Sequence, residues 1–205
     1  MNTQKQVEYR LPDLQYAYTA LEPAYSAELL EIHHRGHHRA YVEGANATVQ
    51  RINAAAGAGD FANINALQRD LAFHVSGHSL HSLFWECMAP AGAAAPTGVL
   101  ADAIGRDFGG LDEFRSLFMS AGGALQGSGW VALSFDASSG ALRVEQRLDH
   151  QDNAIAGSTP LLVMDMWEHA FYLQYRNDKK SWMKAFFGLI DWAGVAHRYQ
   201  ACACP

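Results

Sequence analysis

The chain has 205 residues, of which 49% are hydrophobic and 18% charged, and its formal net charge is −6. This is the composition of a folded globular protein and excludes a disordered one. The acidic balance argues against nucleic acid or a membrane surface as a partner, since both usually require a basic face. No apolar run approaches the length of about 18 residues that a membrane span needs.

The cysteines and the N-terminus predict where the protein works. Three cysteines, Cys87, Cys202 and Cys204, are too few and too odd in number for a disulfide framework and fit a reducing compartment. The Cys-Ala-Cys end is more simply a dispensable tail than a metal-binding one, because chain ends tend to fray. No apolar run follows the charged residues of the N-terminus, which argues against a Sec-type signal peptide. We therefore expect a cytoplasmic protein.

The first part of the chain predicts an antiparallel pair of helices. After an aperiodic arm over residues 1–25, Ser26 is a suitable N-cap for a helix that continues to about residue 56. A turn over 54–60 precedes a second helix over 63–87, and both helices carry apolar residues at three-to-four spacing. The Ala-, Pro- and Gly-rich segment 89–98 has the composition of a linker. We therefore expect two domains, residues 1–90 and 91–205.

The second part of the chain mixes helices and strands. Its sequence predicts helices over 99–108 and 111–125, and then strands over 129–135 and 141–148 that are joined by a turn-rich loop. A short buried strand over 161–164 and helices over 179–187 and 192–201 complete the chain. The predicted fold class is α+β: a helical hairpin, then an α/β domain with a small, three-stranded antiparallel sheet.

Seven of the ten histidines fall in two clusters, one on each helix of the predicted hairpin. On the first helix, His33, His37 and Tyr41 share one face, while His34 and His38 share a neighbouring one. On the second, the spacing of i, i+4 and i+7 aligns three further histidines, which are His74, His78 and His81. A lone histidine on an apolar face is usually a core residue, but two facing clusters favour metal binding. Most of the seven must still serve other roles, since one ion cannot bind them all.

A third feature is Asp165 with His169, placed at the end of a short strand and the start of a helix. A carboxylate at a strand end and an imidazole four residues later can point at one centre. Three imidazoles with one carboxylate suit a first-row transition metal and disfavour magnesium or calcium. Spacing alone does not choose among zinc, iron and manganese.

Four segments of the chain resemble the iron/manganese superoxide dismutases, in the order in which that family carries them. They are EIHHRGHHRAYV (31–42), GHSLHSLFW (77–85), QGSGW (126–130) and DMWEHAFYL (165–173). The resemblance runs from about Tyr9 to Tyr199, and the last segment is highly specific. It implies an enzyme that converts superoxide to dioxygen and hydrogen peroxide at a single iron or manganese ion.

The resemblance also implies a role for each matching residue. The metal ligands would be His33, His81, Asp165 and His169. His37 and Tyr41 would line the gateway for substrate and protons, and three tryptophans would form the apolar wall around the metal: Trp85, Trp130 and Trp167. Glu168 and Tyr172 would lie at a dimer interface, with Glu168 reaching His169 of the partner subunit. The family is dimeric or tetrameric, so we expect a homodimer or homotetramer.

The metal preference depends on which residue hydrogen-bonds the metal-bound solvent. Many iron members place a Gln at the position of Gly77, whereas manganese members supply a Gln from a later strand. This chain resembles a subgroup, common in actinobacteria, that has a histidine there, and His150 aligns with it. Gln151 is the competing candidate, because one residue of slippage exchanges the two. A histidine at this site favours iron over manganese.

The sequence offers less support for three other functions. A zinc hydrolase lacks support, because the chain has no His-Glu-x-x-His motif. A ferritin-like di-iron protein would need two Glu-x-x-His motifs, and only Glu31 with His34 fits that pattern. A non-catalytic relative that only binds metal is the third, and the intact set of ligand positions argues against it.

Overall fold

A computed structural model describes residues 8–90 and 95–203 of the chain. Part of the predicted linker (91–94) and Cys204 lie outside these residues. The helical elements are α1 (Ala27–Ile32), the π-helix η1 (His33–His38), α2 (Arg39–Ala58), α3 (Ile64–Glu86), α4 (Gly98–Phe108), α5 (Leu111–Ala124), the 3-10 helix η2 (Glu168–Ala170), α6 (Tyr172–Tyr175), α7 (Lys179–Leu189) and α8 (Trp192–Ala203). The strands are β1 (Gly129–Asp136), β2 (Ala141–Leu148) and β3 (Ser158–Asp165).

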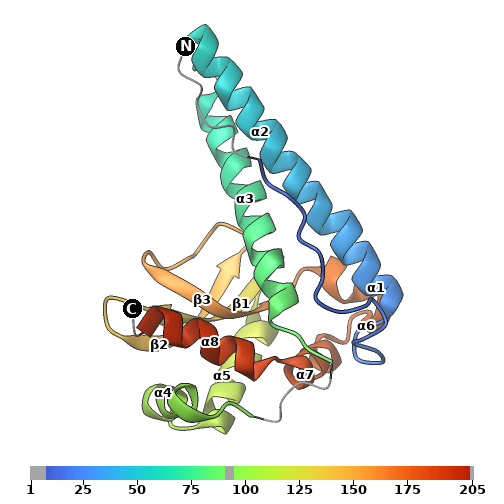
Figure 1. Cartoon of the computed structure of the whole chain (residues 1–205), viewed down its shortest axis with the longest axis vertical. Helices are drawn as coiled ribbons and strands as arrows, with labels where there is room; N and C mark the ends of the chain where they lie inside the picture. Colours follow the sequence, from blue (N-terminus) through green and yellow to red (C-terminus); the bar gives the residue numbers. More distant parts are fainter. Residues whose placement is uncertain (1–7, 91–94, 204–205) are drawn as a thin grey trace.

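The predicted helical hairpin is present: α2 and α3 lie side by side and extend away from the sheet (Figure 1). The Ser26 side chain accepts a hydrogen bond from the Leu29 N–H, as an N-cap should. The first helix continues further than predicted, because residues 54–58 are helical where a turn was expected. Alanine is the best helix former, so this Ala-rich stretch stays helical until Gly59, whose φ of 66° ends the helix.

The first long helix is not continuous, which the residue spacing did not predict. Residues His33–His38 form a π-helix between α1 and α2. Single π-helical turns inside α-helices are rare and occur frequently at functional sites. The wider turn changes which side chains lie together: His37 stacks on His169 with ring centroids 4.2 Å apart, whereas His38 lies against His81 at 5.4 Å.

The sheet has three antiparallel strands in the order β2-β1-β3, as the fold-class prediction required. All eight residues of β1 are buried, which explains its almost unbroken apolar sequence. Strand β3 begins three residues earlier than predicted, because Ser158, Thr159 and Pro160 also pair with β1. Pro160 has no N–H to donate, and the register between β1 and β3 shifts beside its partner Ser134.

Helices cover this sheet and join it to the hairpin. Helix α5 contacts β1 and β2, α4 contacts β2, α8 contacts β3, and the hairpin helix α3 also contacts β3. The core between them is rich in aromatic side chains, such as Phe84 of α3 and Phe186 of α7, which stack at 5.7 Å. None of the helices in the described part of the chain is long and apolar enough to cross a membrane.

Candidate metal centre

Asp165 is the last residue of β3 and lies opposite Trp130 in the β1–β3 register. Its side chain is fully buried. One carboxylate oxygen, Oδ1, accepts a hydrogen bond of 2.8 Å from the Trp167 N–H. The backbone carbonyl of Asp165 accepts another, of 2.9 Å, from the indole of Trp182. The strand, the following turn and α7 therefore fix the position of the carboxylate, and its second oxygen faces the hairpin.

Three imidazoles converge on that second oxygen, Oδ2 of Asp165. The Nε2 atoms of His33, His169 and His81 lie 3.2, 3.3 and 3.6 Å from it. All four potential ligand atoms lie within 4.8 Å of one another. The structure thus brings together all four residues that the sequence predicted as metal ligands. His33 comes from η1 and His81 from α3, on the two sides of the hairpin, whereas Asp165 ends β3 and His169 lies in η2.

Hydrogen bonding shows which nitrogen of His81 carries the proton and which has a lone pair. The Nδ1 atom of His81 lies 2.6 Å from the carbonyl oxygen of Gly77, which can only accept, so this nitrogen carries the proton. Burial lowers the pKa of His81 well below its usual range, so the ring is neutral at pH 7. Its Nε2 then presents a lone pair to the Asp165 carboxylate and finds no hydrogen-bond partner in the described part of the chain.

His33 is also buried and also directs its Nε2 at the Asp165 carboxylate. Its Nδ1 lies 2.7 Å from the hydroxyl of the buried Tyr25, and its Nε2 has no hydrogen-bond partner among the described residues. Burial lowers the pKa of His33 to about 4. A buried lone pair that faces a carboxylate, as the Nε2 lone pair of His81 does, repels it unless a cation lies between the two groups. The donor set, three nitrogens and one oxygen, fits a first-row transition metal.

His150 lies beside the site, and Gln151 does not. The His150 Nδ1 accepts a hydrogen bond of 3.0 Å from the Trp130 indole, so its Nε2 carries the proton. That Nε2–H is buried, and none of the residues 8–90 and 95–203 accepts a hydrogen bond from it. The ring packs against Tyr41 at 4.5 Å, and burial lowers its pKa to about 4. The Gln151 amide instead donates to Asp152 at the surface. Of the two candidates, the geometry favours His150.

The remaining predicted residues surround this centre. Trp167 stacks on His150 at 4.5 Å and lies 5.3 Å from His169, and the Trp85 indole donates to Nδ1 of His38. His37 is half-buried and stacks on His169. Glu168 and Tyr172 are exposed on η2 and α6, where a partner could reach them.

Comparison with known proteins matches both parts of the chain to one family. Residues 8–89 match the model of the alpha-hairpin domain of the iron/manganese superoxide dismutases, and residues 96–198 match that of their C-terminal domain. The chain belongs to the iron/manganese superoxide dismutases. This confirms the family that the four sequence segments indicated, and the function that goes with it.

Individual relatives cover almost the whole chain. A superoxide dismutase [Mn/Fe] of Propionibacterium freudenreichii subsp. shermanii is 47% identical over 93% of this chain and 96% of its own length. A superoxide dismutase [Mn] of Nocardia asteroides is 47% identical over 94% of this chain and 93% of its own length. A third relative, the superoxide dismutase [Mn] of Mycolicibacterium fortuitum, is 47% identical over 95% of this chain and 94% of its own length.

Two contacts in this superoxide dismutase could not be predicted from its sequence. Tyr25 orients His33, but it lies in the aperiodic arm, where no pattern distinguishes a buried tyrosine from an exposed one. The second contact is between the histidine clusters: Nε2 of His38 lies 2.8 Å from Nδ1 of His78. The spacing predicted that the clusters face each other, but it did not identify the pair that touches.

Gly77 leaves the space that the rings of Tyr41 and His150 occupy. A Cβ at this position would lie 2.8 Å from Cδ1 of Tyr41 and 3.2 Å from Cδ2 of His150. We expect Gly77→Ala to displace both rings, to lower the free energy of unfolding by about 1–3 kcal/mol and to reduce dismutase activity roughly tenfold. Urea denaturation and a superoxide decay assay measure the two effects.

The matched control is Gly57→Ala, in the last turn of α2, where an added Cβ has nothing within 4 Å. Because alanine favours helix over glycine, this change should stabilise the protein by up to about 1 kcal/mol and leave activity unchanged. If the two variants had equal stability and equal activity, the positions of the Tyr41 and His150 rings would not require a glycine at residue 77.

Proposed function

We propose that His33, His81, Asp165 and His169 together hold one iron or manganese ion in this superoxide dismutase. The observation that carries the proposal is the buried Nε2 lone pair of His81, which faces the Asp165 carboxylate without a partner. When bound, such an ion supplies a one-electron couple that oxidises one superoxide to dioxygen and reduces a second to hydrogen peroxide, with uptake of two protons. The Asp165 carboxylate contributes a negative charge that favours the more oxidised metal.

Tyr41 and His150 supply proton-bearing groups at the proposed site. Burial, with Asp165 and Asp149 nearby, raises the pKa of Tyr41, so its hydroxyl keeps its proton at pH 7. The Nε2–H of His150 is the only donor that this ring has free, because Nδ1 accepts from Trp130. We propose that this N–H hydrogen-bonds the solvent or substrate in the site, and that His37 and Tyr41 line the way in. The wall of Trp85, Trp130 and Trp167 limits the access of water.

The choice between iron and manganese depends on one residue. Our prediction of iron rests on His150, and the names of the relatives do not support it, since two of the three name manganese alone. The first name includes both metals. Metal analysis of the protein from its native host, with sensitivity to peroxide as a cross-check for iron, measures this preference directly.

The assembly and location are proposals that rest on surface features. Tyr172 and Leu173 of α6 and Ile32 of α1 are large hydrophobic residues with 40–46% of their surface exposed. We propose that α6, with the adjacent Glu168, forms the interface of a homodimer or homotetramer. A cytoplasmic location is supported by Cys87 and Cys202, which are both free thiols. The division into two domains, residues 1–90 and 91–205, stays a prediction.

Loading the metal-free protein with manganese, iron or zinc tests the function. We expect about one ion per chain in each case by elemental analysis, and dismutation with manganese or iron only. Zinc is the control, because it fills a similar site but has no one-electron couple. Two ions per chain, or a fully loaded manganese and iron protein without activity, would overturn the proposal.

A further inference from the structure

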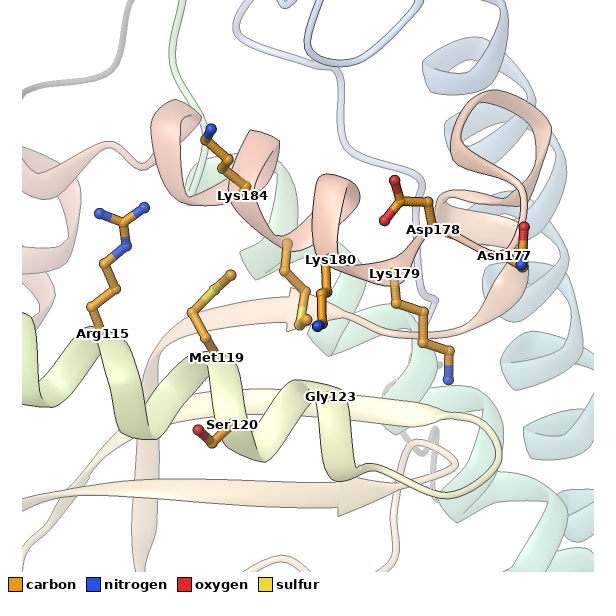
Figure 2. A pocket seen from close by; sticks show the side chains of 10 residues that line it. Arg115, Met119, Ser120, Gly123, Asn177, Asp178, Lys179, Lys180 and Lys184 are labelled. Carbon is orange, nitrogen blue, oxygen red and sulfur yellow. The ribbon is translucent and has the colours of Figure 1, made fainter.

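A groove between α5 and α7 has a cavity volume of about 800 Å³ and lies outside the metal centre (Figure 2). Arg115 and Met119 line it from α5, and Lys180 and Lys184 from α7. Its volume is in the range of small-molecule sites. The groove is therefore large enough for a ligand of moderate size.

The groove concentrates positive charge in an acidic protein. The chain has only four lysines, and three of them, Lys179, Lys180 and Lys184, line this groove together with Arg115. The whole chain carries a formal charge of −6. Figure 2 shows the three lysines on α7 and Arg115 on α5. Most of the lysine charge of the protein is thus placed at one cavity.

The cations have no carboxylate partners. Among the described residues, none of the four lies within 4.0 Å of a carboxylate oxygen of the protein. Asp178 lines the same groove, but its oxygens accept from the backbone N–H and hydroxyl of Ser181 and cap α7. The guanidinium of Arg115 lies over the Phe187 ring at 4.8 Å. The positive charge of the groove, offset in part by Asp178 beside Lys180, is therefore available to a ligand.

The groove also has an apolar part. Met119 is half-buried and Met183 is buried, and both contribute to the lining. Methionine side chains adapt to irregular shapes and make favourable contacts with aromatic rings. We propose that the groove binds a small organic polyanion, with its charged groups on Lys180, Lys184 and Arg115 and an apolar or aromatic part on the methionines. A nucleoside diphosphate has this chemistry and serves as the probe.

Lys179 connects this groove to the metal centre. It also lines a second cavity, of about 400 Å³, together with Trp167, Glu168 and His169. An anion in the groove would neutralise positive charge close to His169, one of the proposed ligands, and superoxide is itself an anion. We therefore expect the ligand to slow superoxide capture at low ionic strength. This coupling rests on the proposed function, whereas binding to the groove does not.

Isothermal titration calorimetry of the manganese-loaded protein with ADP, at low and at physiological salt, tests the binding. We expect one site per chain, weaker at higher salt, with ADP bound more tightly than inorganic diphosphate or adenosine. Lys184→Ala should weaken ADP binding about fivefold. Arg69→Ala is the control: it removes an exposed cation of α3 outside the groove and should leave the affinity unchanged.

Each outcome decides the proposal. No ADP binding at low salt, or equal loss of affinity in Lys184→Ala and Arg69→Ala, would overturn the site. Equal affinity for diphosphate and ADP would overturn the role of Met119 and Met183, and with it the organic ligand. The titration is repeated with zinc-loaded protein, which has no one-electron couple, so that binding is measured independently of dismutation. If ADP binds but the manganese protein does not dismutate superoxide, the proposed function fails and the anion site stands.

Discussion

Asp165→Asn is expected to lose tightly bound metal and, with it, almost all dismutase activity. The change removes the negative charge toward which three imidazole nitrogens point, and it keeps the size and shape of the side chain. Structural metal sites with four ligands contribute about 10–16 kcal/mol, so one ligand is worth roughly 3–4 kcal/mol, or two to three orders of magnitude in affinity. Elemental analysis after dialysis against a chelator measures the loss.

The fold should survive this substitution. The asparagine oxygen can still accept from the Trp167 N–H, and its amide can donate to an imidazole lone pair that the metal-free protein leaves unpaired. We therefore expect metal-free Asp165→Asn to melt at a temperature no lower than that of the metal-free wild type. A lower melting temperature together with full metal retention would contradict a ligand role and leave Asp165 as a cap of the turn.

Asp136→Asn is the matched control. Asp136 is also the last residue of a strand, and its carboxylate also accepts hydrogen bonds from nearby backbone and side chains, here Ser138, Ser139 and Arg143. It has no imidazole partner. This variant should keep one ion per chain and its activity, even if it loses some stability.

His150→Leu is expected to lower dismutase activity about 10- to 100-fold while the metal content stays near one ion per chain. Changes to groups that orient a metal site from outside the ligand set typically have effects of this size. Leucine removes the buried Nε2–H and leaves the Trp130 indole without its acceptor. The unpaired indole N–H should also lower the free energy of unfolding by about 1–3 kcal/mol.

Gln151→Leu separates the two residues that the sequence left open. The Gln151 side chain bonds Asp152 at the surface, so we expect this variant to keep nearly full activity. His150→Gln, which retains a donor, should fall between His150→Leu and the wild type. If Gln151→Leu lost activity and His150→Leu did not, the assignment of His150 would be wrong. Rates of superoxide decay, normalised to bound metal, measure all three.

Local signals predicted most of the fold. The cap at Ser26, the apolar spacing of the hairpin and the buried run of β1 each depend on residues near in sequence, and each element was placed within a few residues. The π-helix was missed because its six residues, HHRGHH, carry no pattern that separates a π-helix from an α-helix. The start of β3 was missed because polar Ser158 and Thr159 enter the sheet only through pairing with β1.

The candidate site was harder to predict from the residues alone. Histidine spacing indicated two facing clusters, but choosing four residues among the many candidates required the resemblance to a family. The partner of His33, Tyr25, could not be found, since its role depends on how the N-terminal arm packs against the hairpin. The sequence also could not decide whether His150 or Gln151 faces the site, because a shift of one residue exchanges them. Their orientation depends on the turn that follows β2, where Asp149 adopts a φ of 47°.

The placement of Asp165 has a consequence for electron transfer. It ends a strand that pairs with the fully buried β1, and hydrogen bonds from Trp167 and Trp182 hold its carboxylate and its carbonyl. A ligand held in this way can shift little when the ion under the proposed function gains or loses an electron. If Asp165 holds the ion as proposed, a fixed carboxylate would keep the reorganisation energy low in both half-reactions, because ligand motion is a main part of that energy. The sheet would then serve the rate of both electron transfers as well as the stability of the fold.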